Sequence, residues 1–201
     1  MLKTFLFAAF FFCAASAAFA AQGNDGFYTR ADAGYVYSTL DGVKETYAAQ
    51  TGFGQKYGDF LRAEFDLSFT RVRLRGAEAF DGRAENGTRA HARSFAAMGT
   101  LFADLFSVGG ATPYVGVGGG IARNALQDFT LNGRRMAGDI RYHAAWQAIG
   151  GVGIDLPANF TLDVSYSYMD AGNVKTKKSG GERLRQDVKM RKVLLGLRYN
   201  F

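Results

Sequence analysis

Apolar and polar residues alternate along most of this chain beyond its first twenty residues. In residues 61–70 every odd position is apolar and every even position is polar or charged, and residues 160–168 and 193–201 follow the same pattern. Successive side chains of a β-strand point to opposite faces, so each segment has one apolar face and one more polar face. The pattern predicts strands rather than helices.

Extending this pattern along the chain predicts eight strands, at residues 27–39, 46–57, 60–73, 92–106, 112–125, 141–155, 159–172 and 186–201. Long polar segments follow the odd-numbered strands, at 40–46, 74–91, 126–140 and 173–185, and short turns follow the even-numbered ones. A membrane barrel has long loops outside and short turns on the periplasmic side, where both termini lie. The sequence therefore predicts an all-β, eight-stranded antiparallel transmembrane β-barrel with long extracellular loops.

A soluble barrel would also alternate, but with its apolar face as the core, and three features favour the membrane instead. The chain ends on Phe201, in phase with Tyr199 and the apolar face, although chain termini usually fray. Aromatic residues gather near the ends of the apolar stripes, as expected at head-group depth. The opposite face carries charges of both signs, at Arg30, Asp32, Arg62, Glu64, Asp66, Asp104, Asp163 and Arg198. Eight strands enclose a space that side chains fill, so we expect these residues to form a paired polar network in the lumen.

The composition agrees with an all-β chain, with 18 Phe, 10 Tyr and 26 Gly but only 2 Pro. Glycines gather in the fifth and sixth predicted strands. We expect the first group to face the second across the ladder and to leave room for bulky lumen side chains: Gly116, Gly118, Gly119 and Gly120 opposite Gly150, Gly151 and Gly153.

The first twenty residues have a different character. Lys3 precedes an apolar run over residues 5–15, and Ala18-Phe19-Ala20 places small residues at a cleavage site. We predict a cleaved secretory signal peptide at 1–20 and one β-barrel domain at 21–201. The alternative is a helical anchor, but the run is shorter than the roughly 20 residues that such a span needs. The single cysteine, Cys13, follows the bulky Phe12, which does not fit a lipoprotein signal, and no thiol is left after cleavage.

Candidate catalytic residues are few. The only histidines are His91 and His143, and the chain has no HExxH, CxxC or phosphate-binding glycine motif. His91 and Ser94 are three residues apart and so fall on opposite faces of a strand, whereas a serine nucleophile needs its base on the same face. His143 has no serine nearby in sequence, and a partner from another strand is left open. We expect a protein that is not an enzyme and that holds no cofactor or metal.

The last long loop is basic, with Lys175, Lys177, Lys178, Arg183 and Arg185. For an exported protein with a net charge of +6, lipid head-group phosphates are nearer anionic partners than nucleic acid. The loop could grip lipopolysaccharide phosphates or an acidic host-surface glycan or protein, or it could simply be solvated.

Several segments resemble the opacity-protein-like family of small outer-membrane β-barrels: 61–64 (LRAE), 113–118 (PYVGVG), 162–168 (LDVSYSY) and the C-terminal 196–201 (GLRYNF). The resemblance spans essentially the whole predicted mature chain and implies a location in the bacterial outer membrane. It also implies that Tyr199 and Phe201 are part of a signal for the barrel-assembly machinery. Where the family usually has an arginine between two tyrosines, this chain has Ser167.

These patterns lead to two functional hypotheses. The first is a structural, surface-exposed protein that stabilises the outer membrane through lipopolysaccharide contacts. The alternative is an adhesin or surface antigen that binds host ligands through its loops. A narrow channel and a lipid A-modifying enzyme are weaker alternatives, and a wide pore is disfavoured because an eight-stranded barrel has a filled lumen.

Overall fold

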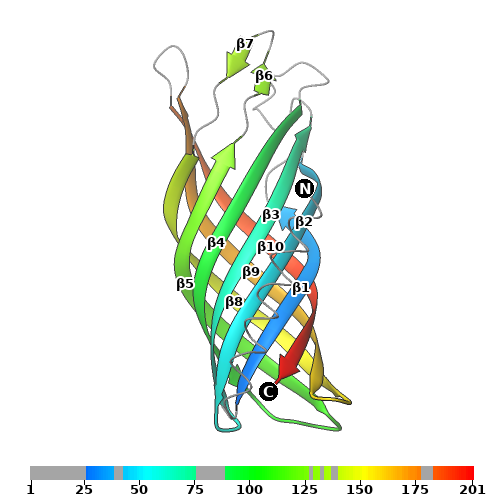
Figure 1. Ribbon diagram of the computed structural model, residues 1–201. Coiled ribbons are helices and arrows are strands. Elements are labelled where there is room, and N and C mark those ends of the chain that lie inside the picture. Colours follow the sequence, from blue (N-terminus) through cyan, green and yellow to red (C-terminus); the bar gives the residue numbers. More distant parts are fainter. Residues whose placement is uncertain are drawn as a thin grey trace.

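The computed structural model describes residues 26–38, 43–75, 89–126, 129–131, 134–136, 140–177 and 183–201. These ranges contain ten strands: β1 (Phe27–Ser38), β2 (Val43–Tyr57), β3 (Leu61–Arg75), β4 (Arg89–Asp104), β5 (Ala111–Leu126), β6 (Phe129–Leu131), β7 (Arg134–Met136), β8 (Ile140–Leu156), β9 (Phe160–Lys177) and β10 (Arg183–Asn200). Eight of them close into an antiparallel barrel in the order β1-β10-β9-β8-β5-β4-β3-β2, with the strands tilted around one axis (Figure 1). The predicted fold class is confirmed.

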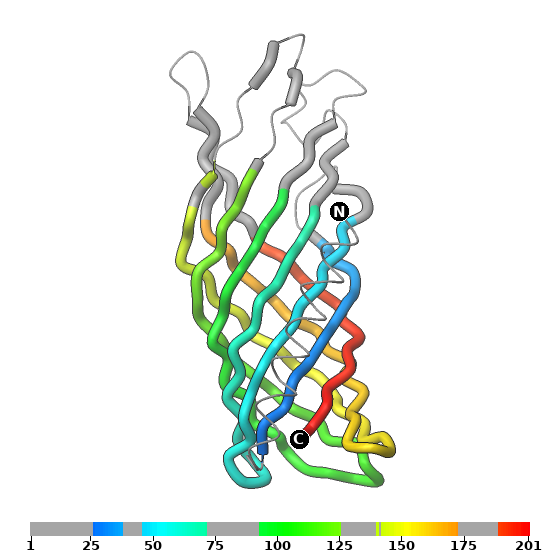
Figure 2. The backbone as a smooth tube through the Cα atoms, in the orientation of Figure 1, coloured from blue at the N-terminus to red at the C-terminus, as the bar shows by residue number. Residues whose placement is uncertain are grey.

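The two ends of the barrel differ in their connections. Short turns join β2 to β3, β4 to β5 and β8 to β9, and the C-terminus lies at this end (Figure 2). We call it the turn end, and the opposite one the loop end. The turn at 157–159 places Ala158 and Asn159 at positive φ, 62° and 63°. At the loop end, β6 and β7 form a separate small hairpin that the sequence did not predict, because three-residue strands are too short to show an alternation.

Several strands extend further toward the loop end than predicted. β3 ends at Arg75 rather than at 73, β4 begins at Arg89 rather than at 92, and β9 ends at Lys177 rather than at 172. Ladder hydrogen bonds join backbones and need no apolar face, so strand pairing continues into polar sequence beyond the apolar band. Part of each predicted long loop is therefore paired strand.

The first and last strands close the barrel. β1 pairs with β10 from Tyr28 opposite Asn200 to Ser38 opposite Met190. Beyond this ladder, the backbone N–H of Phe201 donates to the carbonyl of Phe27 at 2.9 Å. Closure gives each of the eight strands a hydrogen-bonded neighbour on both sides, which is a requirement for a sheet surrounded by lipid.

The outer wall is an apolar band with aromatic rings at both ends. At the turn end, the Phe27 and Phe53 rings lie 5.4 Å apart and the Phe160 and Tyr199 rings 5.0 Å apart. At the loop end, the Tyr35–Tyr47 and Trp146–Tyr168 ring pairs each lie at 5.4 Å. Between these rings, the wall exposes apolar side chains that include Leu101, Val117, Val164 and Leu195. Such a surface is typical of a transmembrane barrel. No helix in the described ranges is long and apolar enough to cross a membrane.

Candidate functional site

The structure places all eight predicted lumen residues on the inner face of the barrel. Seven of them are buried and Asp104 is half-buried. They lie in the half of the lumen nearer the turn end. Ion pairs and aromatic rings join seven of them into one framework, and Asp66 lies beside it.

Arg30 lies at the centre of this framework. Its Nε lies 3.0 Å from Oδ2 of Asp32, and its Nη2 lies 2.9 Å from Oε1 of Glu64. The hydroxyl of Tyr28 donates to the second oxygen of Glu64 at 2.9 Å. One guanidinium therefore contacts two carboxylates away from water, where an unpaired charge would be strongly destabilising.

Arg62 is held between a carboxylate and aromatic rings. Its Nε donates to Oδ1 of Asp104 at 3.0 Å, and its Nη2 lies 2.8 Å from the same oxygen. The guanidinium carbon lies 4.8 Å from the centre of the Phe102 ring and 4.9 Å from that of Tyr114. Cation–π attraction is strongest in such water-excluded surroundings. This arrangement fixes the orientation of Arg62 at the turn end of the lumen.

Two smaller groups complete the polar half. Arg198 pairs with Asp163 through Nε at 3.2 Å, and its guanidinium lies 5.4 Å from the Tyr28 ring centre. Asp66 accepts hydrogen bonds from Thr100 Oγ1 at 2.7 Å and from Gln147 Nε2 at 3.3 Å.

Lys192 is a lumen cation that the sequence analysis missed. Its side chain is buried, it interacts electrostatically with Asp66 and Asp32, and its Nζ has no hydrogen-bond partner among the described residues. In the ladder it lies opposite Ser167, the position at which the family usually has an arginine. The adjacent strand thus supplies a cation here. The sequence did indicate that Lys192 faces the lumen, because it is in phase with Arg198 on β10.

The expected glycine pairing across β5 and β8 is wrong in its register. Gly116 lies opposite Ile149 and Gly118 opposite Gln147, while Gly151 lies opposite Tyr114. The room for large lumen side chains is nevertheless found at the glycines that face inward. A Cβ atom on Gly116 would lie 2.5 Å from the Phe102 ring, and one on Gly151 would lie 2.6 Å from Tyr114.

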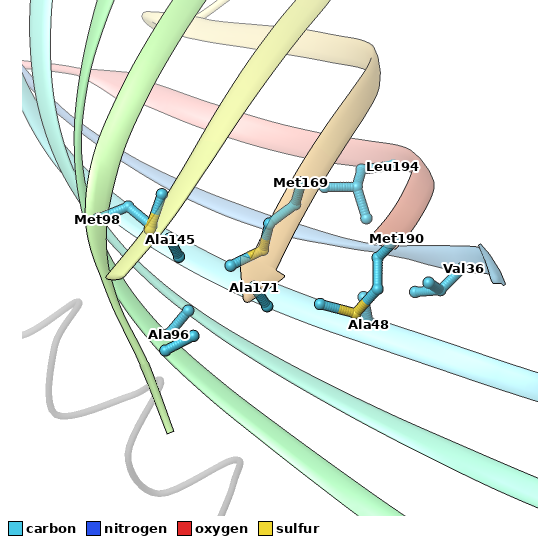
Figure 3. Packing of buried hydrophobic residues seen from close by; sticks show 10 residues of the cluster. Val36, Ala48, Ala96, Met98, Ala145, Met169, Ala171, Met190 and Leu194 are labelled. Carbon is cyan, nitrogen blue, oxygen red and sulfur yellow. The ribbon is translucent and has the colours of Figure 1, made fainter. Parts of the chain in front are cut away.

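The half of the lumen nearer the loop end holds a cluster of apolar side chains next to buried polar ones such as Thr70, Ser94 and Lys192. The cluster comprises Val36, Ala48, Ala96, Met98, Ala122, Ala145, Met169, Ala171, Met190 and Leu194. Figure 3 shows Met98, Met169 and Met190 projecting from three different strands into the interior. The sequence analysis did not predict this cluster, because it considered only the charged residues of the inner face. We call it the methionine cluster.

The predicted basic loop is in part a pair of strands. β9 and β10 remain paired to their ends, which places Lys175 opposite Arg185 and Lys177 opposite Arg183. The side chains of these four residues, and the whole of Lys178, lie outside the described part of the structure.

The C-terminal residues lie on the outer wall at the turn end. The rings of Tyr199 and Phe201 are 5.2 Å apart, and Tyr199 also contacts Phe160. They belong to the turn-end group of aromatic rings.

The structure also places the residues that a serine–histidine site would use. Ser94 donates its hydroxyl to Oδ1 of Asn124 at 2.7 Å rather than to His143, whose Nε2 is buried without a hydrogen-bond partner among the described residues. The side chain of His91 lies outside the described part. No group of three or more His, Cys, Asp or Glu side chains in the described ranges could hold a metal ion.

Comparison with known proteins assigns the class of this barrel. Residues 5–201 match the family model described as the outer membrane protein beta-barrel domain, and the chain belongs to this family. It is therefore a protein of the bacterial outer membrane. No curated protein matches the sequence.

Solved structures with the same fold include two other small outer-membrane barrels. Neisserial surface protein A (NspA) is 18% identical, with a TM-score of 0.61 over 88% of this chain and 98% of its own. Ail, the attachment invasion locus protein of Yersinia pestis, is 16% identical, with a TM-score of 0.51 over 89% and 100%. A second Ail structure, in complex with the heparin analogue sucrose octasulfate, is 14% identical, with a TM-score of 0.53 over the same shares.

Proposed function

We propose that this barrel is a structural protein that stabilises the outer membrane by binding lipopolysaccharide at its loop end. The observation that carries the proposal is the register of β9 and β10, which sets Lys175 opposite Arg185 and Lys177 opposite Arg183. Like charges directly opposite in a ladder destabilise it. A polyanion with closely spaced phosphates would relieve this repulsion, and lipopolysaccharide is the polyanion that surrounds an outer-membrane barrel.

The filled lumen supports a structural role rather than a diffusion pore. The ion pairs of Arg30, Arg62 and Arg198 occupy the half nearer the turn end, and the methionine cluster occupies the other. A barrel of eight strands has little space left once such side chains fill it. In this role the protein is not an enzyme. Tyr199 and Phe201 are the residues that the barrel-assembly machinery recognises.

The same basic hairpin suits the alternative function of an adhesin. Sulfated host glycans are also dense polyanions, and Ail has been solved in complex with the heparin analogue sucrose octasulfate. Host attachment through the paired cations of β9 and β10 is therefore the second candidate.

The test uses a variant in which Lys175, Lys177, Arg183 and Arg185 are replaced by Gln, with R134Q/R135Q in β7 as a control for loss of loop-end charge. Each is expressed in cells that lack the gene, and uptake of a hydrophobic dye reports the outer-membrane barrier. We expect the deletion to raise dye uptake and the control variant to restore the barrier. The four-residue variant should fold but fail to restore the barrier. Full restoration by the four-residue variant would overturn the proposal. If the deletion strain keeps an intact barrier but loses attachment to a heparin-coated surface, the adhesin function is supported instead.

A further inference from the structure

Three arginines lie on the outer wall near the loop end, on three consecutive strands. Arg71 is on β3, Arg93 on β4 and Arg123 on β5, and the residue beside each in sequence, Thr70, Ser94 and Ala122, is buried in the lumen. Because side chains alternate along a strand, the three arginines face away from the lumen.

The register places the three arginines at neighbouring positions of the wall. Arg71 lies directly opposite Arg93, so their Cβ atoms are about 5 Å apart. Arg123 lies opposite Phe95 and is therefore the diagonal neighbour of Arg93. Residues in this relation are roughly 7–8 Å apart. The long, flexible side chain of arginine allows all three groups to converge on one phosphate.

This concentration of positive charge is not compensated within the described part of the wall. The carboxylates described on β3, β4 and β5 are Glu64, Asp66 and Asp104, which all point into the lumen. In addition, Nε of Arg71 is buried and has no hydrogen-bond partner among the described residues. An external anion would supply the missing acceptor.

On β9 and β10, the cations at a similar depth of the wall have different neighbours. On β10, Lys189 lies opposite Asp170 of β9, a cation against an anion. Arg191, one step nearer the turn end, lies between Tyr37 and Tyr168 and has no arginine opposite it. At this depth, the described wall therefore shows neighbouring arginines on β3, β4 and β5 but not on β9 and β10. On β9 and β10 like charges face each other only further out, in the basic hairpin.

The depth of the three arginines indicates the kind of anion. One step toward the turn end from Arg71 and Arg93 lie Phe69 and Phe95, which face each other across the ladder. Arg123 lies level with Phe95 and opposite Tyr142. Aromatic rings mark the boundary between hydrocarbon and head groups. The three guanidinium groups therefore lie at the depth of the lipid phosphates of the outer leaflet.

We propose that Arg71, Arg93 and Arg123 form a binding site for a phosphate of lipid A, the phosphorylated glycolipid anchor of lipopolysaccharide. Planar guanidinium groups bind phosphate oxygens in pairs, and such charge-assisted bonds are strong where water is scarce. The acyl chains of the same molecule would lie along the apolar wall below. This site rests on the proposed function and specifies where one lipid is held.

The test measures binding of bis-phosphorylated lipid A to the detergent-refolded protein by native mass spectrometry. We expect R71Q/R93Q/R123Q to weaken binding about tenfold or more, and the control R191Q to change it less than about twofold. The lysine variant R71K/R93K/R123K keeps the charge but loses the planar fork, and we expect a loss of roughly threefold to fivefold. Heat-modifiable gel mobility shows that each variant is folded, and the lysine variant keeps the test valid if the glutamine variant does not fold.

Dephosphorylated lipid A should bind the wild type as weakly as phosphorylated lipid A binds the glutamine variant. Free inorganic phosphate should not compete at equal phosphate concentration; if it does, the site takes a soluble anion and the proposal fails. Equal losses in R191Q and the triple variant would also overturn the site. If the triple variant binds lipopolysaccharide as well as the wild type, the site is wrong and the proposed function stands. If the wild type binds no lipopolysaccharide, both fail.

Discussion

The two halves of the lumen are filled in different ways. Near the turn end, Arg30, Arg62 and Arg198 are fixed by ion pairs at 2.8–3.2 Å and by aromatic rings. Near the loop end, Met98, Met169 and Met190 pack with alanines and aliphatic side chains (Figure 3). Directional pairs specify one arrangement, whereas methionine adapts its shape to the space that remains.

The difference implies that the ion pairs nearer the turn end define the register of the barrel and that the methionine cluster tolerates change. Removing one member of a buried ion pair leaves an unpaired charge, which costs more than a cavity in most apolar cores. The following changes test this ordering through the free energy of unfolding in lipid vesicles. The fluorescence of Trp146, the only tryptophan, follows the transition, because this side chain lies exposed on the outer wall.

The largest loss is expected for Arg30→Met. It leaves the carboxylates of Asp32 and Glu64 buried without their shared cation. We expect the free energy of unfolding to fall by about 3–5 kcal/mol. The matched control is Arg191→Met on the outer wall, which should cost far less. A similar loss in both variants would show that the buried ion pairs of the lumen stabilise the barrel no more than an exposed arginine does.

Met98→Ala tests the half nearer the loop end and should rank second. It removes a fully buried side chain from the methionine cluster, and we expect a loss of about 2–4 kcal/mol. Met98→Leu nearly conserves the volume and should cost less than about 1.5 kcal/mol. If Met98→Ala is as costly as Arg30→Met, the proposed contrast between the two halves is wrong.

Arg62→Lys keeps the charge and should have a smaller effect. Lysine cannot stack its head group between Phe102 and Tyr114 while it also contacts Asp104, as the guanidinium does. We expect a loss of about 1–2 kcal/mol. A double-mutant cycle with Asp104→Asn separates the ion pair from the stacking. Additive losses would mean that the two contacts do not depend on each other.

Ser167→Ala should have the smallest effect. The hydroxyl is buried and has no hydrogen-bond partner among the described residues, so its removal eliminates an unpaired polar group. We expect a change of less than about 1 kcal/mol, in the stabilising direction. A loss above about 2 kcal/mol would instead show that this hydroxyl supports the adjacent Lys192.

Strand periodicity determined how much of this structure could be predicted. The barrel, its eight strands and the inner position of the charged residues follow from a two-residue repeat, because that repeat assigns every side chain to a face. The methionine cluster does not follow, since Met169 and Met190 lie on the inner face although they are apolar. The pairing of Arg71 with Arg93 depends on register, which alternation alone leaves undefined.

The closing ladder between β1 and β10 has a consequence for how the chain folds. Tyr28 and Asn200, partners in this ladder, are separated by nearly the whole described sequence. Contacts so distant along the chain form slowly, because a large entropy of loop closure opposes them. While the barrel folds, the outer edge of β1 stays unpaired until β10 reaches it. An exposed edge of this kind invites pairing with other chains. The time before β10 pairs with β1 is therefore the period in which aggregation competes most strongly with folding.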